Sequence, residues 1–264
     1  MRMLDYLDSL SKDDWMIRVL RCPECGGEFR FMGEGLECKA CNAWAHISRG
    51  ITLFRTPPSS KREYLFEMNR YKGIALKPPE TYHGFDASYP SVRVEIIKEK
   101  LKDKPLYLNV GQGFGQLEQS MPYKAKICLD QCLEFLRYCQ EQAEIPNTRY
   151  VMGFGERMPF QDNYFPAVVS DSVFQTLVDQ REFLIENARV LKKGGTFILG
   201  ITYKWNYPRK PQDFPADDPE LLCLFLSELG IEAEATYHHL RDRVESNLFL
   251  EDGDFLLITG VKTS

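Results

Sequence analysis

Long apolar runs are missing from this sequence, and so is any excess of positive charge. No uninterrupted apolar stretch approaches the roughly 18 residues that a membrane-spanning helix needs. The first residues, MRMLDYLDSLSKDD, are too acidic and too interrupted for a secretory signal peptide. We therefore expect a cytoplasmic protein that does not associate with membranes.

The charge balance argues against a broad nucleic-acid-binding surface. The 33 basic and 38 acidic residues give a net charge of −5, whereas such surfaces are normally basic. The densest basic stretch, KEKLKDK at 98–104, has the alternating charges of a solvated helix face. A local basic patch is still compatible with the total, so RNA binding stays an alternative that the sequence does not favour.

Eight cysteines are present, and they fall into two sets that predict different roles. One set lies in apolar stretches and is typical of core packing, because a free cysteine behaves as a small buried hydrophobe. The members of this set are Cys128, Cys132, Cys139 and Cys223. The other set forms two Cys-x-x-Cys pairs, CPEC and CKAC, separated by twelve residues: Cys22, Cys25, Cys38 and Cys41.

The paired cysteines predict a structural zinc site. Two facing Cys-x-x-Cys turns supply the four tetrahedral sulfurs that such a site requires. Disulfides rarely form in a reducing compartment, and a redox-active Cys-x-x-Cys needs no matched second pair. Four protein ligands leave no open position, so this zinc would stabilise the fold and not activate water. His46 is close in sequence, but with four cysteines available we do not expect it to be a ligand.

The stretch LYLNVGQGFG (106–115) predicts a strand and a glycine-rich turn beside a ligand. Glycines at every second position let the backbone approach a bound molecule without clashes from Cβ atoms. Asp130, at the end of the next apolar run, could accept two hydrogen bonds from ribose hydroxyls. A nucleoside-containing cofactor is implied. The alternatives are a glycine turn that serves a hairpin or bulge, and an Asp130 that caps the helix after it.

The elements after this turn resemble a known family. KICLDQCLEFLRYC predicts a strand and a helix, residues 148–179 predict two more strands, and FLIENARVLKKGGTFILGI predicts a helix, a Gly-Gly turn and a strand. Over roughly residues 90–264, this order closely resembles the class I S-adenosylmethionine-dependent methyltransferases, specifically the branch with the ubiquinone-type methyltransferases. Several motifs agree, so the resemblance outweighs a dinucleotide-binding dehydrogenase. It implies an α/β fold, a Rossmann-like seven-stranded sheet with helices on both faces.

The resemblance also implies S-adenosylmethionine as cofactor. The positions that would bind it are Asn109, Gly111, Gln112, Gly113, Gly115, Asp130, Gln131, Phe154, Gly155, Glu156 and Asp171. Asn109 and Gln112 replace the usual acidic and small residues of the first loop. Phe154 replaces an aspartate that accepts from the adenine amine, and Pro166 replaces an aspartate before the fourth strand. Loss of cofactor binding therefore stays open as an alternative.

Methyl transfer from a sulfonium is an in-line displacement that requires alignment and exclusion of water, but no nucleophilic serine or cysteine. Candidate general bases for an oxygen or nitrogen acceptor are Asp171 and His83. His238 and His239 are weaker candidates, since adjacent side chains on a strand point to opposite faces. The irregular stretch TYKWNYPRKPQDFPADD (202–218) is the best candidate for a substrate-contacting loop.

The segment LRCPECGGEFRFMGEGLECKACNAWAHISRGITLF resembles the small zinc-ribbon proteins that activate tRNA and protein methyltransferases. It departs from them at Ala45 and His46, where a Tyr-Pro pair is usual. The resemblance implies a tethered ribbon that covers its own catalytic domain, helps to bind substrate, or binds a protein partner. Large-subunit rRNA guanine methyltransferases also carry an N-terminal zinc module, which keeps RNA among the alternatives.

These features divide the chain into three parts. They are a zinc ribbon with an N-terminal helix (1–55), a linker and helical lid (56–104), and a class I methyltransferase domain (105–264). RTPPSS at 55–60 marks the first boundary, because Pro-Pro and Ser-Ser cannot continue a helix or a strand. The favoured function is methyl transfer to an unidentified acceptor. The alternatives are a non-catalytic scaffold that acts through its zinc ribbon and an rRNA or tRNA methyltransferase.

Overall fold

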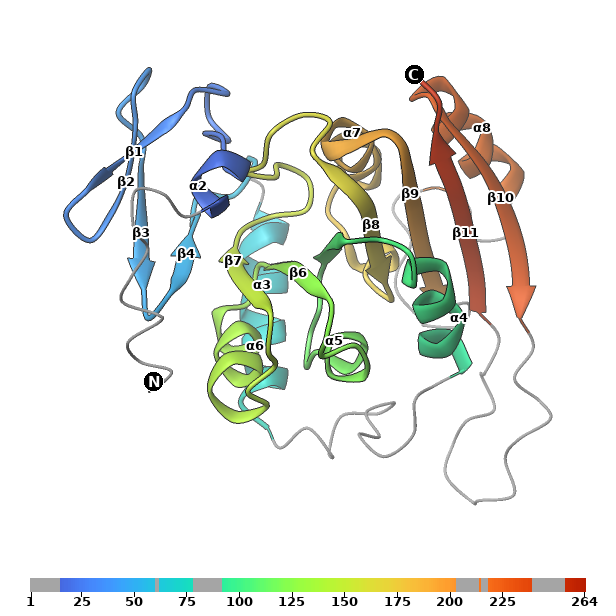
Figure 1. Ribbon diagram of the computed structural model, residues 1–264, viewed down its shortest axis with the longest axis horizontal. Coiled ribbons are helices and arrows are strands. Elements are labelled where there is room, and N and C mark those ends of the chain that lie inside the picture. The colour runs from blue at the N-terminus through green and yellow to red at the C-terminus, as the bar shows by residue number, and fades with distance from the viewer. Residues whose placement is uncertain (1–14, 60–61, 78–91, 203–213, 215–217, 239–254) are drawn as a thin grey trace.

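The computed structural model describes residues 15–59, 62–77, 92–202, 214, 218–238 and 255–264 of the chain. Within these residues the strands form one eleven-stranded sheet in the order β1-β2-β3-β4-β7-β6-β5-β8-β9-β11-β10 (Figure 1). The strands are β1 (Phe29–Met32), β2 (Gly35–Cys38), β3 (Trp44–Ser48), β4 (Ile51–Leu53), β5 (Leu106–Val110), β6 (Ala125–Asp130), β7 (Thr148–Met152), β8 (Phe165–Asp171), β9 (Leu191–Thr202), β10 (Ile231–His238) and β11 (Phe255–Lys262).

Helices connect and cover these strands. The α-helices are α2 (Trp15–Val19), α3 (Arg62–Ala75), α4 (Val92–Leu101), α5 (Gln116–Ser120), α6 (Leu133–Arg137), α7 (Gln180–Val190) and α8 (Pro219–Glu228). A π-helix (Tyr138–Gln142) extends α6, and a 3₁₀ turn (Phe174–Thr176) follows β8. No helix in this described part of the chain is long and apolar enough to cross a membrane.

Seven of the strands confirm the predicted Rossmann-like sheet. β7, β6, β5, β8 and β9 run parallel to their neighbours, and β11 adds to β9 in the antiparallel direction, followed by β10. These parallel strands are short, nearly continuous apolar runs, as expected for strands that are buried on both faces. Their carboxyl ends meet at one edge of the sheet, where ligands bind in open α/β folds.

The two faces of this sheet have separate cores. Leu108 of β5 and Val168 of β8 face α7 and α8, whereas Tyr107 and Val169 on the same strands face α4 and α5. This alternation follows from the two-residue period of a strand. The helices on both faces agree with the predicted fold.

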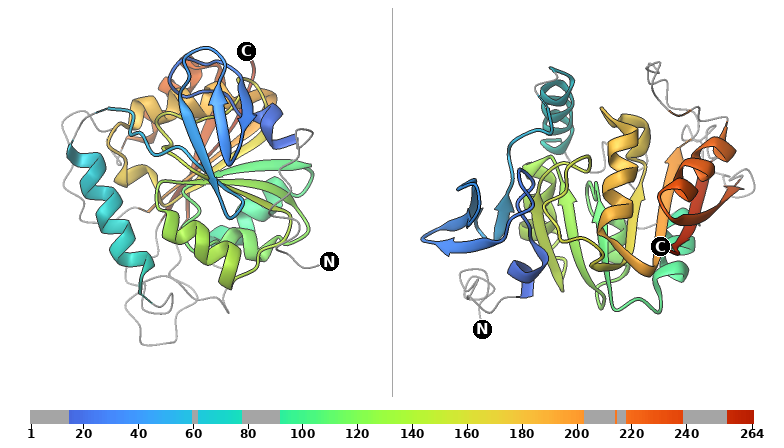
Figure 2. Two further views of the ribbon diagram at one scale, coloured as in Figure 1. Left: turned by 90° about the vertical axis from the view of Figure 1, so that its left-hand side faces the viewer. Right: turned by 90° about the horizontal axis from the view of Figure 1, so that it is seen from above.

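The four N-terminal strands continue the same sheet and are not a detached module. β4 pairs in parallel with β7 through Thr52 opposite Val151 and Leu53 opposite Met152. Figure 2 (right) shows the ribbon strands at one end of the molecule and β10 and β11 at the other. The ribbon therefore covers what would otherwise be the free edge of β7, an exposed row of backbone hydrogen-bonding groups.

Helix α3 packs beside the carboxyl end of the sheet. Its Tyr64 meets the ring of Phe154 edge-on, with centroids 5.6 Å apart. One turn from its end, Tyr71 packs against Phe135, which in turn contacts Phe114 of the glycine-rich loop. The predicted lid region thus places α3 beside Phe154 and the glycine-rich loop.

Candidate functional site

The four paired cysteines form one cluster. The Sγ atoms of Cys22, Cys25, Cys38 and Cys41 all lie within 4.8 Å of one another. The Cys22–Cys41 and Cys25–Cys38 Sγ distances are 3.7 and 3.5 Å, close to the sulfur separation of about 3.8 Å expected around tetrahedral zinc. The donor set and its geometry therefore fit a structural zinc ion.

Local backbone geometry builds this cluster. The amide of Gly26 donates to Cys22 O and the amide of Cys22 donates to Gly27 O, both at 2.8 Å, which closes the first cysteine turn. A Cβ atom at Gly27 would lie 2.9 Å from the Cys38 sulfur, so only glycine leaves room there. His46 is exposed and lies edge-on to Trp44, outside the cluster, as expected.

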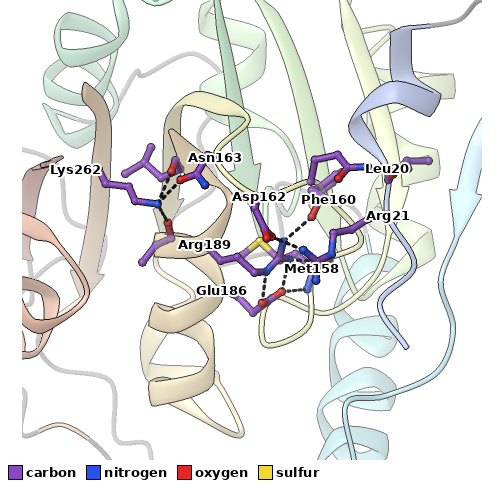
Figure 3. A network of polar contacts seen from close by, with 12 residues as sticks. Leu20, Arg21, Met158, Phe160, Asp162, Asn163, Glu186, Arg189 and Lys262 are labelled. Atoms are coloured by element: carbon purple, nitrogen blue, oxygen red, sulfur yellow. Dashed lines mark hydrogen bonds and ion pairs between the residues drawn. The ribbon is translucent and has the colours of Figure 1, made fainter. Parts of the chain in front are cut away.

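A network of ion pairs joins the first cysteine turn to the loop before β8 (Figure 3). Arg21 and Arg189 both pair with Asp162, the latter at 2.6 Å. Arg189 also pairs with Glu186 at 2.5 Å and donates to Met158 O at 2.9 Å. We call these residues, Arg21, Asp162, Glu186 and Arg189, the seam network.

Two further contacts tie the ribbon to predicted cofactor residues. Arg157 follows Glu156 directly, pairs with Glu24 of the first cysteine turn at 3.1 Å and donates to Thr56 O at 3.0 Å. On the other side, Gln140 of the π-helix donates to Arg49 O at 2.9 Å, while its neighbour Cys139 lies 3.4 Å from Gly113 O. The ribbon is thus connected to both loops at the predicted cofactor site.

The glycine-rich turn, residues 111–115, has the conformation that the sequence pattern predicts. Gly111, Gly113 and Gly115 have φ angles of 80°, 54° and 75°, a region that other residues rarely adopt. A Cβ atom would clash with Val173 at Gly111 and with Ile145 at Gly115, but among the described residues it would meet nothing within 4 Å at Gly113. Gly113 therefore presents its backbone to open space.

Asp130 lies beside that open space. Its two carboxylate oxygens accept from the amides of Gly113 at 3.2 Å and Cys132 at 2.8 Å. Each oxygen keeps a further lone pair, so the carboxylate can still bind a pair of hydroxyls. Burial raises the pKa of Asp130 to about 6, although both amides oppose the shift. The neighbouring Gln131 is half-buried.

The predicted adenine segment, residues 154–156, is largely packed against the protein. The ring of Phe154 is buried against Tyr64 and Val178. A Cβ atom at Gly155 would lie 2.8 Å from the Phe183 ring, so this glycine permits close packing of α7. The Glu156 carboxylate accepts from the Val178 amide at 3.2 Å, and burial raises its pKa to about 7.

Asp171, the candidate general base, pairs with Arg93 of α4 at 2.8 Å. Burial raises its pKa although Arg93 opposes the shift. His238, at the end of β10, stacks on Phe255 with centroids 4.7 Å apart, and the Arg93 guanidinium lies over the same ring. The structure therefore brings Asp171 and His238 to one region. His83, His239 and most of the predicted substrate loop 202–218 (residues 203–213 and 215–217) fall outside the described residues.

Below the glycine-rich turn lies a buried polar cluster that sequence reasoning missed in part. Asn109 was a predicted cofactor residue, but its side chain donates to the carboxylate of Glu118 in α5 at 2.7 Å. Glu118 is fully buried, and Gln112 is nearly so. No sequence signal singles out Glu118, because α5 is a five-residue helix of otherwise ordinary composition.

A hollow lined by described residues lies elsewhere. It has a volume of about 690 Å³ and is lined by residues such as Lys100, Thr196 and Glu232. Thr196 lies midway along β9, four positions before Gly200, which is paired with Asp171 at the carboxyl end. The position of the hollow therefore gives no support to a ligand site at the carboxyl edge, which rests on the glycine-rich turn and Asp130.

Comparison with known proteins agrees with the geometry of that edge. Residues 108–199 match a family model described as a methyltransferase domain. The chain is 30% identical over 131 residues to the malonyl-(acyl-carrier protein) O-methyltransferase of Marinomonas sp. (strain MWYL1), a match that covers 46% of this chain and 48% of that protein. It is 27% identical over 118 residues to the demethylmenaquinone methyltransferase of Thermotoga maritima, covering 44% and 51% respectively.

The chain thus spans about half the length of these curated relatives. Among solved structures, it superposes on the (4+2)-cyclase SpnF with a TM-score of 0.57 and 13% identity, over 79% of this chain and 99% of that one. At this identity the similarity supports the fold alone. The family model thus shows a methyltransferase domain at residues 108–199, and the superposition agrees with its Rossmann-like fold.

Proposed function

We propose that this chain, which carries a methyltransferase domain at residues 108–199, transfers the methyl group of S-adenosylmethionine to an acceptor. The observation that carries the proposal is the open side of Gly113 directly beside the Asp130 carboxylate. Two hydroxyls of a ribose can bind such a carboxylate while the glycine backbone borders the rest of the cofactor.

The residues present fit this cofactor. Asp130 would hold the ribose and the turn at 111–115 would border the methionyl part. Phe154 and Tyr64, each 2% exposed, pack on one another beside the predicted adenine position. When bound, S-adenosylmethionine supplies an electrophilic methyl group on its sulfonium. Phe154 cannot accept from the adenine amine, so it would contribute packing in place of the usual hydrogen bond.

This chain's residues then have two tasks, to align the acceptor and to exclude water. α3 lies over the site through Tyr64 and Tyr71 and would exclude water there. Asp171 would take the acceptor's proton after release from Arg93, and the raised pKa of its carboxyl suits that role. A small-molecule acceptor, as in the ubiquinone-type branch, is the class we favour, supported by the named substrate of the Thermotoga relative.

The zinc ribbon would have a structural role in this function. Zinc held by the four cysteines would fix the first cysteine turn, and through Arg157 and the seam network it would fix the loop that carries Phe154. The resemblance of residues 20–54 to small zinc-ribbon activators is consistent with this role, as is the pairing of β4 with β7. A reducing compartment, in which the cysteines stay thiolates, belongs to the proposal.

Calorimetric titration of the zinc-loaded protein with S-adenosylmethionine and S-adenosylhomocysteine tests the proposal. We expect micromolar binding of both, lost on Asp130→Ala and kept on Asp103→Ala, an exposed carboxylate outside the site. Absence of binding by the unmodified protein would contradict the proposal and favour a non-catalytic scaffold. Binding that weakens steeply with salt, or only in the presence of RNA, would favour the RNA-directed alternative.

A further inference from the structure

The side chains of Asn109, Gln112 and Glu118 form a buried polar cluster below the glycine-rich turn. They are 4%, 7% and 0% exposed. Asn109 Nδ2 donates to Glu118 Oε1 at 2.7 Å, and the Tyr107 hydroxyl is 3.4 Å from the same oxygen. Asn109 Oδ1, Glu118 Oε2 and both amide atoms of Gln112 have no hydrogen-bond partner among the described residues. Buried polar atoms without partners are rare and costly, so their concentration here points to a ligand or to its polar surroundings.

Glu118 is the carboxylate that contacts the Asn109 side chain, at 2.7 Å. Lys126, equally buried, donates to the carbonyl oxygens of Met121, Lys124 and Pro146, each at 3.0 Å. A buried ammonium requires a counter-charge, and Glu118 is the carboxylate that attracts it in this core. Burial raises the pKa of Glu118, whereas the Asn109 amide, Lys126 and the Tyr107 hydroxyl oppose the shift and favour the charged form. The other titratable groups that interact with it are Cys128, Cys139 and Tyr150.

We infer that Glu118 is a positioning residue whose carboxylate places a negative charge beside the glycine-rich turn. This inference rests on the proposed methyltransferase function. The Asn109 amide donates to Glu118 Oε1, and Glu118 Oε2 lies 3.8 Å from the position that a Cβ atom would take at Gly115, so the charge lies beside the predicted cofactor site. S-adenosylmethionine carries one more positive charge than S-adenosylhomocysteine. A buried carboxylate beside the turn therefore favours the reactive cofactor over its product.

An exchange of the side chains of Asn109 and Glu118 tests whether the Glu118 carboxylate has this role. Calorimetry with both ligands is carried out on Glu118→Gln, on Asn109→Asp, and on the combined Asn109→Asp/Glu118→Gln protein. We expect Glu118→Gln to weaken S-adenosylmethionine binding about tenfold and S-adenosylhomocysteine binding less. Asn109→Asp places two carboxylates within hydrogen-bond distance and should weaken both. The combined variant restores one acid and one amide, and should bind within about threefold of the unmodified protein.

Tyr107→Phe is the matched control, since it removes only the 3.4 Å contact and should change binding by less than about twofold. Thermal unfolding of each unliganded variant separates loss of fold from loss of binding. If Glu118→Gln does not fold, the difference in ligand binding between Asn109→Asp and the combined variant still tests the inference.

Two results overturn the inference alone: a Glu118→Gln protein that discriminates the two ligands like the unmodified protein, or a combined variant that binds no better than Asn109→Asp. An unmodified protein that binds neither ligand overturns the proposed function, and the inference with it.

Discussion

Two groups of polar residues in this molecule differ in how completely they are paired. In the seam network, Arg189 pairs with Glu186 and Asp162 and donates to the carbonyls of Phe160 and Met158. Below the glycine-rich turn, four buried atoms of Asn109, Gln112 and Glu118 are without partners among the described residues. The seam network is complete without a ligand, whereas the cluster below the turn is not. The comparison indicates that one group maintains the structure and the other prepares a site.

The difference has a physical basis. A paired charge in a protein interior recovers part of its lost hydration through its partners, but an unpaired polar group recovers none. A protein retains such unpaired groups where function requires them. The ribbon is likewise joined to the Rossmann-like sheet by paired groups, through the hydrogen bonds of β4 and the ion pairs of the seam network.

Removal of zinc should have the largest effect on stability, because the cysteine turns hold residues of the seam network in place. Without zinc, four thiols within 4.8 Å of one another no longer hold the two cysteine turns together, and Arg21 and Glu24 lose their fixed positions. We expect a chelator to lower the melting temperature by about 10 °C, with recovery when zinc is added back. Cys223→Ser, which lies outside the cluster, should have no such effect. A purified protein with no bound zinc and an unchanged melting temperature would contradict this expectation.

Within the seam itself, Arg189→Ala should be the most damaging single substitution. It leaves Glu186, Asp162 and two carbonyl groups without their shared donor, and should lower the free energy of unfolding by about 3 kcal/mol. The matched control is Arg30→Ala, which breaks an exposed pair with Glu37 and should cost less than about 1 kcal/mol. Urea denaturation measures both. Equal losses for the two variants would mean that the seam network contributes no more than a surface ion pair.

The role of Asp130 at the cofactor site can be tested by the pH dependence of stability and of cofactor affinity. Burial raises the pKa of Asp130 from 3.8 to about 6, so its contribution to stability of the unliganded protein is present below about pH 4 and is lost as the pH rises through 6. Ribose binding requires the carboxylate, so affinity should change in the opposite direction and fall by up to about tenfold per pH unit below pH 6. Calorimetry between pH 5 and 8 measures this slope. Asp130→Asn should bind the cofactor weakly, and its affinity should not depend on pH in this range. An equal slope in that variant would assign the titration to a group other than Asp130.

Much of this architecture could be predicted from local sequence patterns. Cysteine pairs three positions apart belong to single turns, so the spacing alone is sufficient to predict the cluster that the structure contains. The seven strands and the conformations of Gly111, Gly113 and Gly115 also follow from patterns within short windows. The positions of Gly113 and Asp130 side by side follow from the parallel order of β5 and β6.

Tertiary structure alone decided which polar groups would be buried and with what partners. Arg21 and Asp162 are 141 positions apart, and nothing near either residue predicts their pairing. The pairing of β4 with β7 likewise joins segments from two predicted domains into one sheet. Glu118 has the sequence surroundings of an exposed helical residue, yet the packing of α5 places its carboxylate in the core against Asn109. Local sequence determines backbone conformation, but burial and charge pairing depend on segments that only the folded chain brings together.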